Sequence, residues 1–240
     1  MDKVYVDAHC HLYDFEAKDI EEFLAKNIII VSVAEDASTS ARSLELRRTG
    51  RIYACVGIHP WEVEKIDKEA EISKILAYSK KADCIGEVGL DKKFVSHLFS
   101  KQKEIFEKMV EIAVSHNLPL NIHAAGAWRE VLEVLDEWKA EIAIFHWYTG
   151  PLDVLDKIVS RGYFITVNPS IKIQQKMRKI VEHVPLDVIL TESDGPYNYR
   201  GLLLKPDLVP STIEAISKIK GVSAERVRET IYNNFKRVFK

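Results

Sequence analysis

Five of the eight histidines stand at or just beyond the end of a short apolar run, where imidazoles could bind a metal ion. They are His9, His11, His59, His123 and His146. Residues i and i+2 of a strand point to the same face, so His9 and His11 should project together, away from Cys10. A His-x-His pair alone is more often part of a hydrogen-bonded core than of a metal site, so further ligands are needed. The other histidines, His97, His116 and His183, are expected at helix ends or in loops as solvated or capping residues.

Two more apolar runs lead into carboxylates. Glu87 lies within Gly86-Glu87-Val88-Gly89, and the run beginning at Val188 continues into Glu192 and Asp194. Taken singly, Glu87 would more often be exposed or salt-bridged, but the run into Glu192 and Asp194 would bury charge at a severe cost without compensation. Together with the histidines they predict a metal centre, with Asp7 behind it to orient a histidine.

The segments that must position these side chains alternate between short β-branched runs and longer stretches of helical period. Eight strands are expected, at Val4–Ala8, Ile28–Val33, Ile52–Val56, Cys84–Glu87, Leu120–His123, Ile142–Phe145, Tyr163–Val167 and Val188–Glu192. Repeated strand-helix units predict an α/β fold with a parallel sheet, and 240 residues is close to the roughly 250 typical of a (β/α)₈ TIM barrel. We therefore predict one domain over residues 1–240, with its site at the carboxyl ends of the strands.

Helices are expected between the strands. The segment 100–116 places its apolar residues on one helical stripe, and Asn117-Leu118-Pro119 should end it. After a loop over 195–210, two helices are expected, the first opened by a capping box of Ser211 and Glu214.

Composition and charge narrow the functional classes. A net charge of −2 leaves no general cationic field to attract a polyanion, so any contact with nucleic acid should be local. Cys10, Cys55 and Cys84 lie in or beside apolar runs and are expected to be buried thiols in a reducing compartment. The charged start of the chain does not look like a signal peptide and no apolar run is long enough to span a bilayer, so we expect a cytoplasmic protein without membrane contact.

Nearly the whole chain resembles the TatD family of metal-dependent deoxyribonucleases and related amidohydrolase-like hydrolases. The resemblance is carried by Asp7-Ala8-His9-Cys10-His11-Leu12, Gly57-Ile58-His59-Pro60, Gly86-Glu87-Val88-Gly89-Leu90-Asp91, Pro119-Leu120-Asn121-Ile122-His123, Phe145-His146, Glu192-Ser193-Asp194-Gly195-Pro196-Tyr197 and Asn234-Phe235-Lys236-Arg237-Val238-Phe239. It implies two divalent cations. His9, His11 and Asp194 would hold one, His123 and His146 the other, and Glu87 would bridge them.

The chain departs from that family in two places. Where the family usually has a basic residue shortly after the histidine of the fifth strand, this sequence reads Ala124-Ala125-Gly126-Ala127. Lys92 replaces the family's aromatic residue after Gly-Leu-Asp and is followed by Lys93 and Phe94. These lysines are more simply interpreted as solvated residues than as replacements for the missing phosphate contact.

The resemblance suggests cleavage of DNA phosphodiester bonds by a metal-activated water, in the manner of a 3'-5' exonuclease. Asp194 would orient or deprotonate that water, and His59 would contact a substrate phosphate or the leaving oxygen. Glu192 would support a ligand or position the substrate. Imidazole and carboxylate ligands suit Zn²⁺, Mn²⁺ or Fe²⁺, and the resemblance keeps Mg²⁺ as an activator. The expected partner is DNA or a short oligonucleotide bound at one end; the oligomeric state is left open.

Two other functions fit the same residues. A barrel of this kind could direct the same chemistry at a small ester, lactone or amide. Alternatively, the protein could be a catalytically idle metal-binding barrel. Assays on single-stranded DNA and on a panel of lactones and amides would separate these possibilities.

Overall fold

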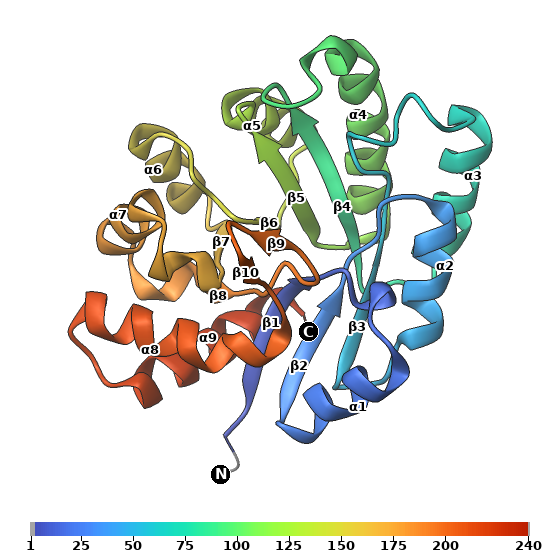
Figure 1. Cartoon of the computed structure of the whole chain (residues 1–240). Coiled ribbons are helices and arrows are strands. Elements are labelled where there is room, and N and C mark those ends of the chain that lie inside the picture. Colours follow the sequence, from blue (N-terminus) through green and yellow to red (C-terminus); the bar gives the residue numbers. More distant parts are fainter. Residues whose placement is uncertain (1–2, 240) are drawn as a thin grey trace.

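The computed structural model describes residues 3–239, in which eight parallel strands form a ring with helices around its outside (Figure 1). Each strand pairs with the next in the chain, from β1 to β8. The strands are β1 (Tyr5–Cys10), β2 (Ile28–Ser32), β3 (Ile52–Val56), β4 (Cys84–Asp91), β5 (Leu120–Ala125), β6 (Ala143–Phe145), β7 (Phe164–Val167) and β8 (Ile189–Thr191). The predicted (β/α)₈ barrel is confirmed, and every predicted strand overlaps an observed one.

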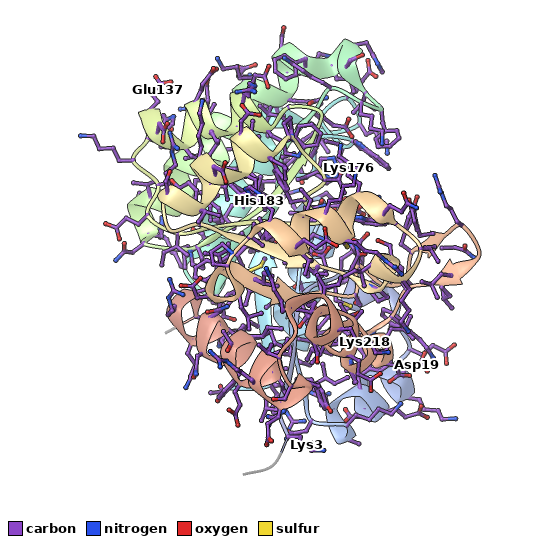
Figure 2. The ribbon with its side chains drawn as sticks, turned by 90° about the vertical axis from the view of Figure 1, so that its left-hand side faces the viewer. Lys3, Asp19, Glu137, Lys176, His183 and Lys218 are labelled. Carbon is purple, nitrogen blue, oxygen red and sulfur yellow. A yellow bond between two sulfur atoms is a disulfide. The ribbon has the colours of Figure 1, made fainter. Side chains whose placement is uncertain are left out.

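The helices lie on the outer face of the ring (Figure 1). They are α1 (Ala17–Ala25), α2 (Ala37–Leu46), α3 (Lys68–Ser79), α4 (Phe99–His116), α5 (Trp128–Glu137), α6 (Leu152–Ser160), α7 (Gln175–His183), α8 (Val209–Lys220) and α9 (Ala224–Val238). α4 ends as predicted, because Asn117 has a left-handed backbone with φ of 59°. Figure 2 shows charged side chains such as Glu137 and Lys218 on this outer layer.

The predicted capping box at Ser211 is wrong. α8 begins at Val209, and the Ser211 hydroxyl lies inside the first turn, where it donates to Leu208 O at 2.7 Å. The loop before α8 contains a short hairpin of β9 (Asn198–Tyr199) and β10 (Leu202–Leu203). Because α8 begins two residues before Ser211, this serine cannot cap the start of the helix.

The barrel closes between β8 and β1 partly through a side chain. The Ser193 N–H donates to Asp7 Oδ1 at 2.8 Å, and beyond it the Asp194 N–H donates to His9 O at 2.9 Å. Asp7 also accepts a weak bond from the His9 backbone N–H. The expectation that Asp7 orients an imidazole ring is therefore wrong, since its carboxylate joins the two edge strands instead.

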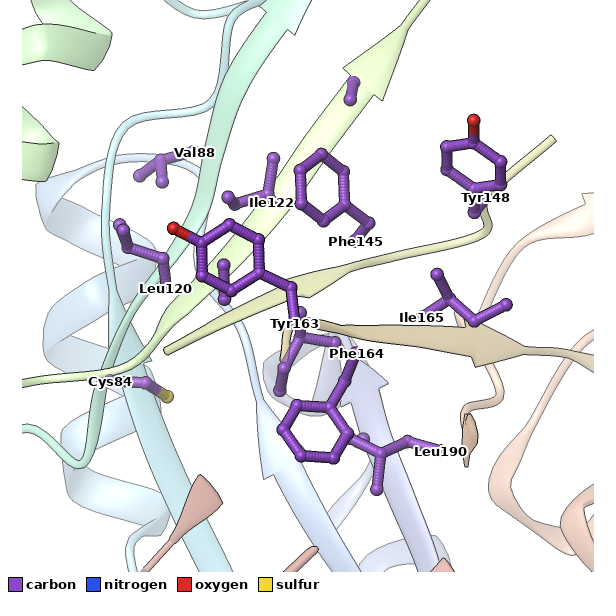
Figure 3. Close-up of a cluster of buried hydrophobic side chains, with 14 of the residues drawn as sticks. Cys84, Val88, Leu120, Ile122, Phe145, Tyr148, Tyr163, Phe164, Ile165 and Leu190 are labelled. Carbon is purple, nitrogen blue, oxygen red and sulfur yellow. The ribbon is translucent and has the colours of Figure 1, made fainter. Parts of the chain in front are cut away.

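The core packs the strands against each other and against the helices. Val88, Ile122 and Phe145 are neighbours in register on β4, β5 and β6, and all three are fully buried (Figure 3). Such packing holds the carboxyl ends of the strands rigidly, which fixes the side chains that emerge there. Within residues 3–239, no helix has the length and apolar character needed to cross a membrane.

The expectation of three buried free thiols is wrong for two of them. Cys55 and Cys84 are partners in the register of β3 and β4, their Cα atoms lie 4.4 Å apart, and they form a disulfide. The sequence gives little sign of this pair because 29 positions separate the two cysteines. Cys10 is buried and free as expected, so only one of the three cysteines fits the expectation of free thiols in a reducing compartment.

Candidate metal centre

The predicted ligands meet at the carboxyl end of the barrel. His9 lies near the end of β1, while Glu87 lies within β4 and His123 within β5. His146 and Asp194 follow β6 and β8 directly or within three residues. The strand ends of a barrel point to one mouth, so five separate segments deliver their side chains to the same place.

Glu87 stands at the centre of the cluster and faces two groups of ligands. Its Oε2 lies 3.4 Å from His9 Nε2 and 3.5 Å from His11 Nε2. On the same side, Asp194 Oδ1 lies 3.4 Å from His9 Nε2 and 3.7 Å from His11 Nε2. Two imidazoles and two carboxylate oxygens therefore surround one space beside β1 and β8.

The other oxygen of Glu87 faces a different set of imidazoles. Oε1 lies 2.9 Å from His123 Nδ1 and 3.0 Å from His146 Nε2. His59 Nε2 is the third nitrogen on this side, at 3.4 Å. The carboxylate of Glu87 is thus shared between two groups of nitrogen atoms.

The donor set fits divalent metal ions. Ligands about 2.0–2.2 Å from an ion leave neighbouring donor atoms about 3.0–3.5 Å apart, which is close to the spacing on both sides of Glu87. His9 Nε2 is buried without a hydrogen-bond partner, although two carboxylate oxygens lie 3.4 Å away. The ligand atoms of His9, His11 and Asp194 all lie within 4.8 Å of one another. His9, His11 and Asp194 could therefore hold a metal ion together.

On the β1 side, neutral groups orient the imidazoles from behind. Asn121 Oδ1 accepts from His9 Nδ1 at 2.8 Å, and the Asn121 amide is itself fixed by donating to Ala8 O. His11 Nδ1 lies 3.1 Å from the Tyr13 hydroxyl, which donates to Glu35. Each contact places the proton on Nδ1 and leaves Nε2 free to bind an ion.

On the β5 and β6 side, the groups behind the imidazoles are carboxylates. Asp91 Oδ2 lies 3.1 Å from His123 Nε2, so the proton of that ring faces away from Glu87. Glu192 Oε2 lies 3.7 Å from His146 Nδ1 and is held by the Thr166 hydroxyl at 2.6 Å. Glu192 therefore lies behind the ring of His146, and its role in supporting a ligand stays a prediction.

His59 differs from the other four histidines of the cluster. The Trp61 backbone N–H donates to His59 Nδ1 at 3.3 Å, so in the neutral ring the proton sits on Nε2. Burial lowers the pKa of His59, which favours that neutral form. Its Nε2–H then faces Glu87 Oε1 at 3.4 Å, so His59 can act as a hydrogen-bond donor, and the same nitrogen also belongs to a group with Glu87 and His123 that could hold an ion.

The charges of the cluster are strongly coupled. Burial raises the pKa of Glu87, but His146, His59 and His9 outweigh this and hold it well below its usual range. Burial and the neighbouring His9 lower the pKa of His146, while Glu87 and Glu192 raise it, to a net value of about 9. In the metal-free protein the carboxylates are therefore balanced by protons on imidazoles, which an arriving cation would displace.

Asp194 occupies an unusual backbone conformation. Its φ is 58°, in the left-handed region that aspartate tolerates better than most residues but still avoids. Such conformations persist where the surroundings impose them, and they are concentrated at functional sites. Here the backbone bond to His9 O holds the turn that carries the carboxylate to the cluster.

Several residues outside the cluster behave as the sequence suggested. Lys92 pairs with Glu130, and Lys93 is exposed and forms no ion pair among the described residues. His97 is exposed in a short turn before α4. His183 pairs with Asp156 on the surface at 2.6 Å.

The chain is similar in sequence to proteins named metal-dependent hydrolases and deoxyribonucleases. Residues 6–240 match the sequence profile of TatD related DNase. A protein of Methanocaldococcus jannaschii named an uncharacterized metal-dependent hydrolase is 33% identical over 248 residues, covering 100% of this chain and 98% of its own. Human deoxyribonuclease TATDN3 is 30% identical, covering 98% of this chain and 94% of its own.

The fold is shared with solved structures. YjjV, a TatD homologue from Escherichia coli, superimposes with a TM-score of 0.90 at 23% identity, covering 100% of this chain and 99% of YjjV. The match to the family over almost the whole sequence confirms the resemblance seen in the motifs. The chain belongs to the TatD related DNase family of metal-dependent hydrolases.

Proposed function

We propose that this protein is a deoxyribonuclease that removes nucleotides from DNA ends, as a 3'-5' exonuclease, with two divalent cations at the mouth of the barrel. The observation that carries the proposal is the position of Glu87, whose two oxygens face separate groups of ligand atoms. The family description and the name of the human relative support DNA as the substrate.

The residues around Glu87 define two places for an ion. His9, His11 and Asp194 would hold one cation and His123 and His146 the other, with Glu87 binding both. When bound, such ions lower the pKa of a water molecule and neutralise charge on a phosphoryl oxygen. Because the ligands are imidazoles and carboxylates without thiolate, Zn²⁺, Mn²⁺ or Fe²⁺ should bind best, with Mg²⁺ as an activator.

Two side chains have roles in moving or placing protons. Asp194 keeps its carboxylate ionised, because the neighbouring imidazoles of His11 and His9 outweigh burial and lower its pKa. An ionised carboxylate at the edge of the cluster can orient the attacking water and accept its proton. His59 would donate its Nε2–H to a phosphate oxygen or to the leaving oxygen.

The charge of the chain favours an end of a strand over a long duplex. With a net charge of −2, the protein can neutralise few phosphates at once. The salt dependence of DNA binding should therefore be shallow. A slope that corresponds to many phosphate contacts would contradict the exonuclease mode.

A paired assay tests the proposal. Protein purified without chelator is supplied with Mn²⁺ or Mg²⁺ and given labelled single-stranded DNA in one arm, and a panel of lactones, esters and amides in the other. We expect stepwise shortening of the DNA from its 3' end. Turnover of the small substrates alone would indicate the amidohydrolase alternative, and no turnover in either arm would indicate an idle barrel.

A further inference from the structure

The exposed aromatic side chains of residues 3–239 are all found at one end of the barrel. They are Trp61, Phe94 and Tyr197, with exposed fractions of 41%, 60% and 51%. These residues follow β3, β4 and β8, at the same end as the candidate metal ligands. A single exposed aromatic ring needs no explanation, but the collection of all three at one mouth indicates a ligand.

Trp61 and Phe94 form a pair that is held next to the candidate metal ligands. Their ring centroids lie 5.8 Å apart, and Trp61 lies 6.2 Å from the ring of His123. The buried carboxylate of Asp91 holds both, since Oδ2 accepts from Trp61 Nε1 at 2.6 Å and Oδ1 accepts from the Phe94 N–H at 2.8 Å. The same carboxylate contacts His123, so the distance between the aromatic pair and the ligands is fixed.

A second aromatic group stands across the ring of strands, in the loops after β6 and β8. The ring of Trp147 lies 6.0 Å from that of Tyr197 and 5.1 Å from that of Tyr199. Gln174 joins this group by accepting from Trp147 Nε1 at 3.1 Å and donating to the Tyr199 hydroxyl. Trp147 directly follows the candidate ligand His146 in the sequence, so this aromatic group also lies next to the candidate metal ligands.

Each aromatic group carries a cation that forms no ion pair among the described residues. Lys93 Nζ lies 4.8 Å from the centre of the Phe94 ring, and the Arg200 guanidinium lies 5.4 Å from that of Tyr199. A flat ring next to a free positive charge matches a nucleotide, which presents a flat base next to a phosphate.

We propose that these two aromatic groups are stacking subsites for unpaired nucleobases on either side of the phosphodiester bond to be cleaved. The inference rests on the proposed function and deepens it, because it assigns recognition of the substrate to residues that hold no metal. Stacking accepts any base but needs an open base face, so single strands should be preferred to duplexes.

The test uses a substrate without bases. The metal-loaded protein is given a short oligothymidylate and a strand of the same length made of tetrahydrofuran abasic units, which keeps the phosphates and lacks the ring faces. The variants are Phe94→Ala and Tyr197→Ala, singly and together. Both side chains are more than half exposed, and the Trp61–Asp91 bond stays intact.

The matched control is Tyr232→Ala, which removes an aromatic ring paired with a cation on α9, where Lys236 Nζ lies 4.7 Å from the ring centre. Thermal unfolding of every variant checks the fold. Each mouth variant should raise KM for oligothymidylate by about 5- to 150-fold, the effect of losing one stacked base. KM for the base-free strand should not change, and Tyr232→Ala should match the wild type on both strands.

The outcomes separate the two proposals. If the wild type cleaves oligothymidylate but the mouth variants treat both strands as the wild type does, the stacking subsites are wrong and the nuclease proposal stands. Equal losses on both strands would also overturn the stacking subsites, because bases would then not be what these rings contact. If the wild type cleaves neither strand, the proposed function fails and the subsites with it.

Discussion

The two groups of imidazoles around Glu87 differ in where the neighbouring carboxylates lie. On the side of β1 and β8, Asp194 faces the ion position directly, and the imidazoles of His9 and His11 are backed by the neutral groups of Asn121 and Tyr13. On the side of β5 and β6, Asp91 and Glu192 lie beside the ring nitrogens of His123 and His146 that do not contact Glu87. There the charge lies behind the imidazoles.

This difference has a chemical consequence. A carboxylate behind an imidazole makes its nitrogen a better ligand, and a carboxylate among the ligands adds its charge directly. The two ion positions can therefore have similar charge while only one presents a free acceptor oxygen to substrate and water. We expect proton transfer to depend on the β1 and β8 side, and retention of the second ion to depend on the carboxylates behind the other side.

Removal of Asp194 should have the largest effect. Asp194→Ala deletes both a candidate ligand and the proposed proton acceptor, so kcat on DNA should fall by about 10²- to 10⁴-fold at saturating metal. Steady-state cleavage of labelled single-stranded DNA measures this. Asp14→Ala removes an exposed carboxylate from the turn after β1 and serves as the control. A kcat close to that of the wild type would show that the proton goes elsewhere.

Metal affinity should rise with pH up to about 9. The pKa of His146 is raised from 6.5 to about 9, so in the metal-free protein its proton stabilises the fold below pH 6.5, and this contribution is lost as the pH rises through 9. An ion must displace that proton, so affinity should increase by up to about tenfold per pH unit below 9. Calorimetric titration with Mn²⁺ in buffers of different ionisation enthalpy counts the protons released. Constant affinity between pH 7 and 9 without proton release would contradict this balance of charge.

Asp91→Asn tests the carboxylate behind His123. The amide keeps an oxygen for the backbone contacts but loses the charge, so one of the two ions should bind about 10- to 100-fold more weakly while the other is unaffected. Asp156→Asn is the matched control, since it removes the carboxylate beside His183 on the surface. Equal weakening of both ions would mean that the two sides of Glu87 are not independent.

Tyr13→Phe tests the neutral partner on the other side and should have the smallest effect. The variant removes the hydroxyl 3.1 Å from His11 Nδ1, and a neutral hydrogen bond of about 0.5–1.5 kcal/mol corresponds to about 2- to 12-fold weaker binding of one ion. Tyr163→Phe, which loses a buried hydroxyl bonded to Ala140 O, is the control. If metal affinity falls as much in Tyr13→Phe as in Asp91→Asn, the neutral and charged partners do not differ in their effect on metal binding.

The fold and the meeting of the candidate ligands at one mouth were predictable because they depend on local patterns. Apolar β-branched runs such as Ile28–Ser32 and Ile52–Val56 are typical of strands. In a barrel of parallel strands, the carboxyl ends of all strands lie at the same end of the barrel. Side chains such as His123 and His146 could therefore be grouped before any distance was known.

Contacts that depend on how neighbouring strands align could not be predicted from the sequence. Asn121 reaches His9 across 112 positions, and Cys55 meets Cys84 only because β3 and β4 align at those residues. Asp7 was expected behind an imidazole but joins β1 to β8 at the seam of the barrel. In each case the partner is set by packing between strands, which periodicity along one strand does not specify.

Anomalous diffraction from crystals loaded with Mn²⁺ would test the two-ion account most directly. We expect two peaks, one on each side of the Glu87 carboxylate, the first in contact with His9, His11 and Asp194 and the second with His123 and His146. A single peak under saturating metal, or peaks that do not share Glu87, would contradict it.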